Sequence, residues 1–204
     1  MKYAKSQQSG FSLVETLVAI TILLVVIVGP MKISSKASNS SSFSNEQVVA
    51  FFLAQEGAEI AQKARDDAII KSFLPTGHTD YDADPWATFI REVSNPRPFR
   101  WCYAADGCGL ELNTDDDGTL KPVERCNGAG SCRLYYDSSN ERARYTHEPA
   151  GNTQTPYTRI VYFETMPGDQ QVKVTSRVYW RSGSIKDLQE VEVVTYLFNV
   201  YGRP

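Results

Sequence analysis

Hydrophobic residues follow three different patterns along this chain, and each pattern predicts a different element. From Phe11 to Val28 nearly every position is apolar, which at ~1.5 Å per helical residue gives a helix of ~27 Å, close to the thickness of a bilayer's hydrocarbon core. From Asn45 to about Ser72, apolar residues recur every three or four positions, as on one face of a helix. Beyond residue 150, β-branched and aromatic residues alternate with polar ones, which is typical of strands.

The amphipathic stretch should present one apolar face to the rest of the molecule. The residues expected on this face are Val49, Phe52 or Leu53, Ile60, Ala64 and Ala68. Gly57 within it costs about 1 kcal/mol relative to alanine, which suggests that a strand approaches closely or that the cost is tolerated. Ser44 followed by Gln47 matches a capping box, so a second helical unit is expected to start at Ser44, after the serine-rich segment 34–44.

The C-terminal third predicts an antiparallel sheet. Its three strand-like runs are Thr158–Glu164, Val172–Arg181 and Leu188–Tyr201, separated by short polar turns. One face, with Val172, Val174, Ser176 and Val178, should pack against the 45–72 helix. The predicted fold class is therefore α+β, a long N-terminal helix packed on a C-terminal antiparallel β-sheet.

A loop-rich segment, 76–98, connects the helix to the rest of the domain. It is interrupted by prolines and aspartates, so little regular structure is expected in it. Trp86 and Phe89 should hold it against the domain, and a short helix could form over 86–93.

A single acidic residue interrupts the membrane-length run near its start. An unpaired Glu15 in lipid would cost a few kcal/mol, so an intramembrane partner is expected for it. At the other end of the run, Gly29 and Pro30 predict a kink or break in the helix. A secretory signal peptide would have a shorter apolar core with small residues after it, but here Ser9 and Gly10 precede the core.

The order of Gly10, Phe11 and Glu15 resembles the type IV prepilin signal, and the stretch after residue 50 (LAQEGAEIAQKARDD) resembles one found in many pilin-like proteins. The resemblance implies that a prepilin peptidase/methyltransferase cuts after Gly10 and methylates the new amino terminus at Phe11. Glu15 would then meet the α-amino group of a neighbouring subunit during assembly, an attraction that is strong in low dielectric. An ordinary signal anchor with a tolerated glutamate is the alternative.

This resemblance implies four segments. They are a leader at 1–10, a transmembrane and filament-core helix at 11–31, its amphipathic continuation at 32–72, and an extracytoplasmic β-rich domain at 73–204. The chain would be a structural subunit, a minor pilin or secretion pseudopilin and not an enzyme, with other pilin subunits and an inner-membrane assembly platform as partners. It would cross the inner membrane once, in contact with lipid, before joining a cell-surface or periplasmic filament. The alternative function is a monomeric membrane-anchored binding or adhesion protein.

Charge argues against a broad nucleic-acid surface. Loss of residues 1–10 would reduce 21 basic residues to 19 against 24 acidic ones, so the formal charge of −3 becomes −5. Such an acidic domain lacks the electrostatic footprint of a nucleic-acid-binding protein.

The four cysteines are expected to form two disulfides in an oxidising compartment. Cys102 and Cys108 are separated by five residues, and so are Cys126 and Cys132. Each pair could close its own tight loop. Alternatively, a hairpin centred on residues 116–118 would set Cys102 opposite Cys132 and Cys108 opposite Cys126.

No catalytic or metal-binding pattern emerges, and no cofactor is expected. His78 and His147, the two histidines, lie in loop-like contexts and are expected to be exposed. The cysteine spacing does not suit zinc. Asp115 and Asp117 form a weak calcium candidate, since they lack the alternating ligand spacing and a downstream glutamate. Aromatic residues such as Trp101 and Tyr136 could form a sugar-binding patch, but cross-strand packing is the more common use of such residues.

Overall fold

The structure is a computed structural model, and it describes most of the 204 residues. The described residues are 10, 12–73, 85–91, 99–113, 120–121, 123–128, 130–139, 143–183 and 187–200. The leader before Gly10, together with Phe11, His78 and the calcium candidates Asp115 and Asp117, lies outside them. The chain divides into two compact units, Met1–Asn45 and Glu46–Pro204.

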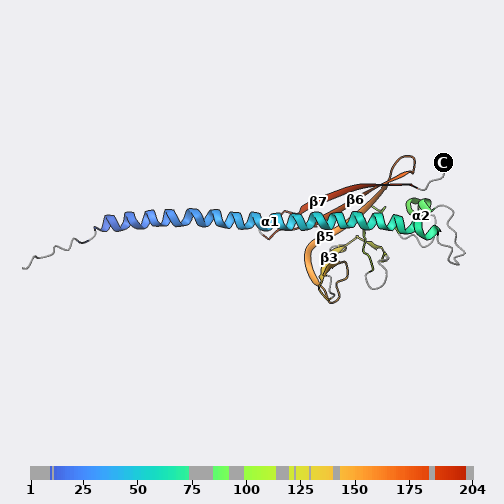
Figure 1. The fold of residues 1–204 in the computed structure, drawn as a ribbon. Helices are drawn as coiled ribbons and strands as arrows, with labels where there is room; N and C mark the ends of the chain where they lie inside the picture. The colour runs from blue at the N-terminus through green and yellow to red at the C-terminus, as the bar shows by residue number, and fades with distance from the viewer. Residues whose placement is uncertain are drawn as a thin grey trace, which may run out of the picture. The chain divides into compact units, whose positions relative to one another are not determined.

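The order of elements confirms the predicted α+β class (Figure 1). The helices are α1 (Leu13–Phe73) and α2 (Pro85–Arg91). The strands are β1 (Cys108–Gly109), β2 (Glu124–Arg125), β3 (Arg133–Asp137), β4 (Arg144–Thr146), β5 (Thr153–Thr165), β6 (Gln171–Trp180) and β7 (Gln189–Phe198). The short helix expected at 86–93 corresponds to α2, and Trp86 and Phe89 are buried as expected.

The long helix is not broken at either of the two predicted positions. α1 continues through Gly29 and Pro30, so a break there is wrong for this structure, while a kink at Pro30, which lacks one helical donor, stays a prediction. No second unit starts at Ser44, whose hydroxyl donates to the Ser40 carbonyl at 2.9 Å instead of capping a new helix. The Ser44 hydroxyl is therefore satisfied within the helix.

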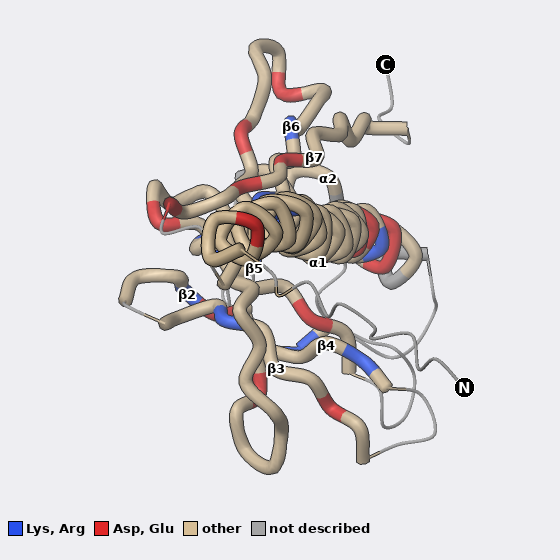
Figure 2. The backbone as a smooth tube through the Cα atoms, turned by 90° about the vertical axis from the view of Figure 1, so that its left-hand side faces the viewer, with Lys and Arg blue, Asp and Glu red and all other residues tan. Residues whose placement is uncertain are grey.

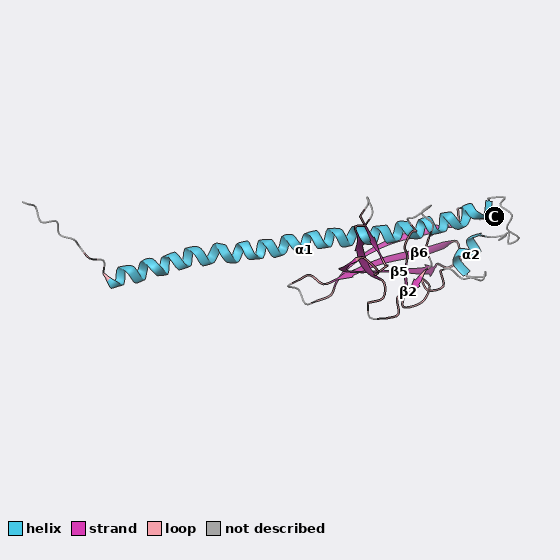
Figure 3. Ribbon diagram, turned by 90° about the horizontal axis from the view of Figure 1, so that it is seen from below, coloured by secondary structure: helices cyan, strands magenta, loops and turns pink. Residues whose placement is uncertain are grey.

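The sheet is antiparallel, and its three long strands form the predicted meander. β5 pairs with β6 from Thr158↔Tyr179 to Thr165↔Val172, and β6 pairs with β7 from Gln171↔Phe198 to Trp180↔Gln189. The other edge of β5 pairs with β1 and β3, which in turn pair with β2 and β4. The part of α1 that belongs to the second unit, residues 46–73, is called the domain part of α1 below. Figure 3 shows β5 and β6 lying alongside it.

Small residues allow the domain part of α1 to pack closely on this sheet. The buried helix residues include Ala50, Leu53, Ala54, Ala58, Ala61 and Ala64, and the sheet contributes Val172, Val174, Ser176 and Val178, as predicted. A β-carbon on Gly57 would overlap the Ser176 side chain, so the glycine marks the close approach of a strand. Of the two candidates left open, Leu53 is 4% exposed and packs inward, whereas Phe52 is 62% exposed.

The structure joins Cys102 to Cys108 and Cys126 to Cys132, each bridge closing its own loop. It also contains a hairpin around the segment of the alternative arrangement, because β1 pairs with β2 and Leu112 pairs with Leu120. Cys108, however, faces Arg125 and not Cys126 in that hairpin. The hairpin therefore forms, but its register and its bridges both differ from the alternative arrangement, and the local pairing is the one observed.

Candidate processing and assembly site

The predicted processing site lies at the beginning of α1, where little of the chain surrounds it. Gly10 is exposed, and a β-carbon there would meet no atom within 4 Å. The first backbone bond of the helix runs from Thr16 N to Ser12 O at 3.1 Å. An enzyme could therefore reach the backbone around Gly10 without displacing a described part of the chain.

The helix that follows carries apolar side chains on all sides. Leu13 is 79% exposed, and the large apolar residues up to Ile33 are exposed around the whole circumference. Two threonines, Thr16 and Thr21, donate their hydroxyls to the carbonyls of Leu13 and Val18 at 2.8 Å. These hydroxyls are therefore hydrogen-bonded within the helix and need no water. Among the described residues, α1 is the one helix long and apolar enough to cross a membrane, with a mean hydropathy of 2.5 in its most apolar window. Such a surface is covered by lipid or by other helices when the protein is in place.

Glu15 lies in the first turn of this helix, next to the partial positive charge of its N-terminus. It makes no hydrogen bond or ion pair with any residue that the structure describes. In lipid, a carboxylate without a counter-charge costs a few kcal/mol.

A buried arginine joins the domain part of α1 to the sheet. Arg159, on β5, is 1% exposed. Its Nη1 donates to Glu56 Oε2 at 2.5 Å and to the Leu53 carbonyl at 3.3 Å, and its Nη2 donates to the Leu110 carbonyl at 3.0 Å. Because a buried guanidinium must be paired, this side chain fixes the position of α1 against β5 and against the disulfide-containing segment 102–132, called the cysteine region below.

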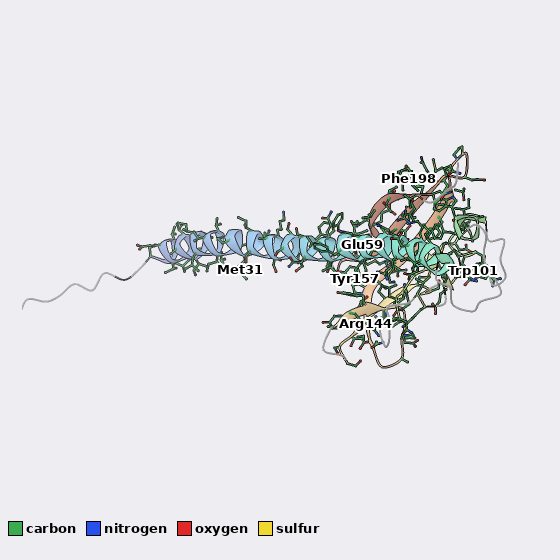
Figure 4. The ribbon with its side chains drawn as sticks, turned by 45° about the vertical axis from the view of Figure 1, so that its right-hand side comes forward. Met31, Glu59, Trp101, Arg144, Tyr157 and Phe198 are labelled. Atoms are coloured by element: carbon green, nitrogen blue, oxygen red, sulfur yellow. A yellow bond between two sulfur atoms is a disulfide. The ribbon has the colours of Figure 1, made fainter. Side chains whose placement is uncertain are left out.

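Tyr157, two residues earlier on the same strand, makes a second link. Its hydroxyl donates to the Glu46 carbonyl at 3.3 Å, and its ring packs against Trp180. Burial, together with the neighbouring Tyr145 and Glu46, raises the pKa of Tyr157 to about 12, so the phenol stays neutral and can donate. Figure 4 shows Tyr157 beside the domain part of α1.

The disulfide-closed loops cover one edge of β5. The Cys102 carbonyl accepts a bond from Phe163 N at 2.8 Å, and the Cys132 carbonyl accepts one from Arg159 N at 3.1 Å. Cys108 lies opposite Val161 between them. Both bridges therefore hold short backbone segments against this edge of the sheet.

His147 is not the exposed loop residue that the sequence suggested. Its Nδ1 lies 3.2 Å from the Arg133 carbonyl, and its Nε2 is buried without a hydrogen-bond partner. Burial, with a contribution from the positive charge of Arg159, lowers the pKa of His147 to about 4. The imidazole is therefore neutral at physiological pH, with Nδ1 as the donor to Arg133.

A hydrogen-bonded carboxylate lies beside this histidine. Glu111 accepts bonds from Lys121 Nζ at 2.8 Å, Thr146 Oγ1 at 2.6 Å and His147 N at 2.8 Å. Burial alone would raise the pKa of Glu111, but these donors outweigh it and lower the pKa. The group is a structural polar cluster that connects the cysteine region to β4.

The described residues contain no group of three or more His, Cys, Asp or Glu side chains that could hold a metal ion. Three of the aromatic residues considered as a sugar-binding patch make separate contacts within the domain. Tyr157 packs in the core, Tyr103 packs on Phe163, and Trp101 lies beneath Arg100 and Arg125. Sequence reasoning missed Arg159, although one signal was available: it is the charged residue on the otherwise inward-facing alternation of Tyr157, Val161 and Phe163.

Comparison with known proteins identifies the N-terminal segment. Residues 5–29 match the family described as the prokaryotic N-terminal methylation motif. No curated protein and no solved structure matches the chain. The matched motif points to a structural protein, processed by prepilin peptidase and assembled with other pilins. Its position at the start of a long apolar helix, followed by an α+β domain, is the arrangement expected of a type IV pilin-like protein and supports that assignment.

Proposed function

We propose that this chain is a minor structural subunit of a type IV pilus or a related pilus-like filament. The observation that carries the proposal is the placement of Gly10 and Glu15 at the head of an apolar helix whose described side chains are not covered by the rest of the chain. The helix waits in the inner membrane and then joins the helices of other subunits, while the sheet domain remains outside the membrane.

Processing creates the positive counter-charge that the Glu15 carboxylate lacks. Cleavage after Gly10 frees the amine of Phe11, and methylation leaves it protonated at physiological pH. An ammonium and a carboxylate within ~4 Å attract each other far more strongly in low dielectric than in water. Glu15 of an incoming subunit therefore favours the position beside the amino terminus of a subunit already in the filament.

Pro30 gives the same helix a position at which it can bend or lose helical hydrogen bonds. It lacks the backbone donor of an ordinary helical residue, and Gly29 before it has no side chain, so a β-carbon there would meet no described atom within 4 Å. Packing among other subunits can bend or open α1 at Gly29 and Pro30 at a smaller cost than elsewhere along the apolar run.

Replacement of Glu15 by glutamine tests the assembly role. The neutral amide keeps the size of the side chain and removes its charge, and breaking a buried ion pair costs about 3–5 kcal/mol. Sheared filaments should contain at least about a hundredfold less Glu15→Gln protein than wild type, while the membrane pool is undiminished. Glu59→Gln, at an exposed position on the domain part of α1, is the matched control and should assemble normally.

The same experiment separates the filament subunit from a monomeric anchored binding protein. An anchored binding protein has no use for a charge in its membrane helix. If Glu15→Gln reaches the sheared fraction as wild type does, or if wild type never reaches that fraction, the structural role proposed above is wrong.

A further inference from the structure

One edge of the sheet is formed by a single long strand, β7. Within the described part of the chain, β7 pairs only with β6, and that pairing runs through ten consecutive residue pairs without a shift in register. Val194 is 40% exposed, Tyr196 46% and Phe198 48%. Exposed edges of this kind are normally shortened, bulged or protected by lysine or proline, and residues 187–200 contain neither lysine nor proline.

The backbone of β7 has groups available for another strand. Asn199 N donates to Gln170 O at 3.0 Å, so the odd-numbered residues of β7 direct their backbone groups toward β6 and the even-numbered ones direct theirs away. Glu192, Val194 and Tyr196 therefore present free N–H and C=O groups along the edge. The Phe198 carbonyl already accepts bonds from Arg65 and from Val200 N, which ends the available stretch.

The opposite edge of the sheet is built differently. There the outermost strands are β2 and β4, of two and three residues, and the register of β3 on β5 shifts between Arg133 and Tyr135. Both disulfides lie on that side, and Phe198 and Arg144 mark the two edges on opposite sides of α1 (Figure 4). A second copy cannot extend the sheet well by placing its own β2 or β4 against β7.

The charges of β7 select an orientation for self-pairing. Seen along α1, acidic residues mark β7 beside β6 (Figure 2), and its outward face carries Glu190 and Glu192 at one end and Tyr196 and Phe198 at the other. Parallel pairing of two β7 strands in register would set each glutamate against its own copy, which destabilises a sheet. Antiparallel pairing centred on Val194 instead sets Glu192 opposite Tyr196 and Glu190 opposite Phe198.

Neighbouring side chains make the antiparallel register electrostatically complementary. Lys173 lies beside Tyr196, and Arg177 pairs with Glu192 at 2.6 Å. Across the strands of the joined sheet, one row of outward-facing side chains would contain Lys173 and Tyr196 from one copy and then Glu192 and Arg177 from the other. Signs alternate along this row, and the central row contains only Val194 and its neighbour Thr175 from each copy.

We propose that β7 binds β7 of a second copy of this chain, antiparallel and centred on Val194. The domain part of α1 begins at the Gln189 end of β7, where Tyr157 bonds Glu46, and reaches the Phe198 end at Arg65. The two-fold relation therefore joins chains that run in opposite directions. On the proposed function, on which this consequence rests, such a contact links subunits of two adjacent filaments and not neighbours within one filament.

Cysteine crosslinking of the full chain in mild detergent tests the pairing. Opposed residues in a hydrogen-bonded pair lie ~5.5 Å apart at Cα, within the range of a disulfide. Val194→Cys should give at least about tenfold more covalent dimer than Glu164→Cys, which is also exposed on the outer face but lies on β5. Equal yields from the two variants would overturn the proposal.

Two further variants fix the register. Glu192→Cys mixed with Tyr196→Cys should form heterodimers, while each variant alone should form few homodimers, because 192 faces 196 in the proposed pairing. Efficient Glu192→Cys homodimers would indicate parallel pairing and contradict the proposal. Retention of both native disulfides by mass spectrometry confirms that each variant has folded. Since no filament is needed, this test can fail without affecting the proposed function, and the Glu15→Gln test can fail without affecting β7 pairing.

Discussion

The two parts of α1 use the same helical backbone for opposite purposes. From Leu13 to Ile33, the large apolar side chains of the helix are exposed. From Ala50 onward, alanines together with Leu53, Ile60 and Ile69 are buried in the domain. A helix stays folded in the domain by packing, whereas the first part needs lipid or other helices to cover it. The chain thus has one apolar helix surface that its own sheet domain buries and another that lipid or other helices must cover.

Among substitutions in the domain, replacement of Arg159 should lower the free energy of unfolding the most. Its replacement by methionine leaves the Leu53 and Leu110 carbonyls without their donor, and each buried polar group left unpaired costs about 1–3 kcal/mol, whereas the half-exposed Glu56 carboxylate can be hydrated. Guanidinium unfolding of the full chain in detergent, followed by tryptophan fluorescence, measures the loss. An unchanged midpoint would mean that α1 is held to the sheet without this arginine.

A pair of leucines tests the comparison directly. Leu53→Ala removes a buried side chain and should lower the free energy of unfolding of the domain by about 2–4 kcal/mol. Leu23→Ala, the same change in the exposed part of the helix, should leave that free energy unchanged within about 0.5 kcal/mol. Similar losses in the two variants would contradict the division between the parts of α1.

Acid should weaken the domain through His147. The pKa of His147 is lowered to about 4 in the folded state, from 6.5 when unfolded, so the unfolded chain binds the proton first. Stability is therefore full above pH 6.5 and falls as the pH drops toward 4, by about 3 kcal/mol. His147→Asn, which can still donate to the Arg133 carbonyl, should flatten this slope between pH 6.5 and 4.5, and a slope identical to wild type would show that another group causes it.

The smallest effect concerns Gly57. Alanine there favours the helix by about 1 kcal/mol but overlaps the Ser176 side chain, and overpacking costs about 1–3 kcal/mol. A net loss of about 1 kcal/mol is expected. Combining it with Ser176→Gly should restore part of the loss, while Gln55→Ala, on the exposed face, is the matched control. A stabilised Gly57→Ala single variant would show that the helix and the strand can move apart.

Patterns that depend on local chemistry predicted much of this molecule. The apolar run, the meander of β5 to β7 and the packing of Gly57 follow from periodicity and turn residues. The breaks at Pro30 and Ser44 failed because local signals compete with the rest of the helix: one lost donor does not end it, and the Ser44 hydroxyl binds Ser40. Arg159 and His147 were missed because their burial depends on segments that are distant in sequence.

The N-terminal site was predictable for a different reason. The matched motif is a short stretch of sequence, residues 5–29, so it can be recognised without any tertiary contact. The open edge of β7 carries no comparable signal, since strand periodicity does not reveal which strand lies at an edge.

The mature amino terminus of the chain, exported by its native host and recovered from sheared filaments, tests the central claim most directly. Mass spectrometry should find a chain that begins at Phe11 and carries an N-methyl group, because only this product supplies a cation for Glu15 of the next subunit. A chain that begins at Met1, or at a residue beyond Val28, would contradict the account.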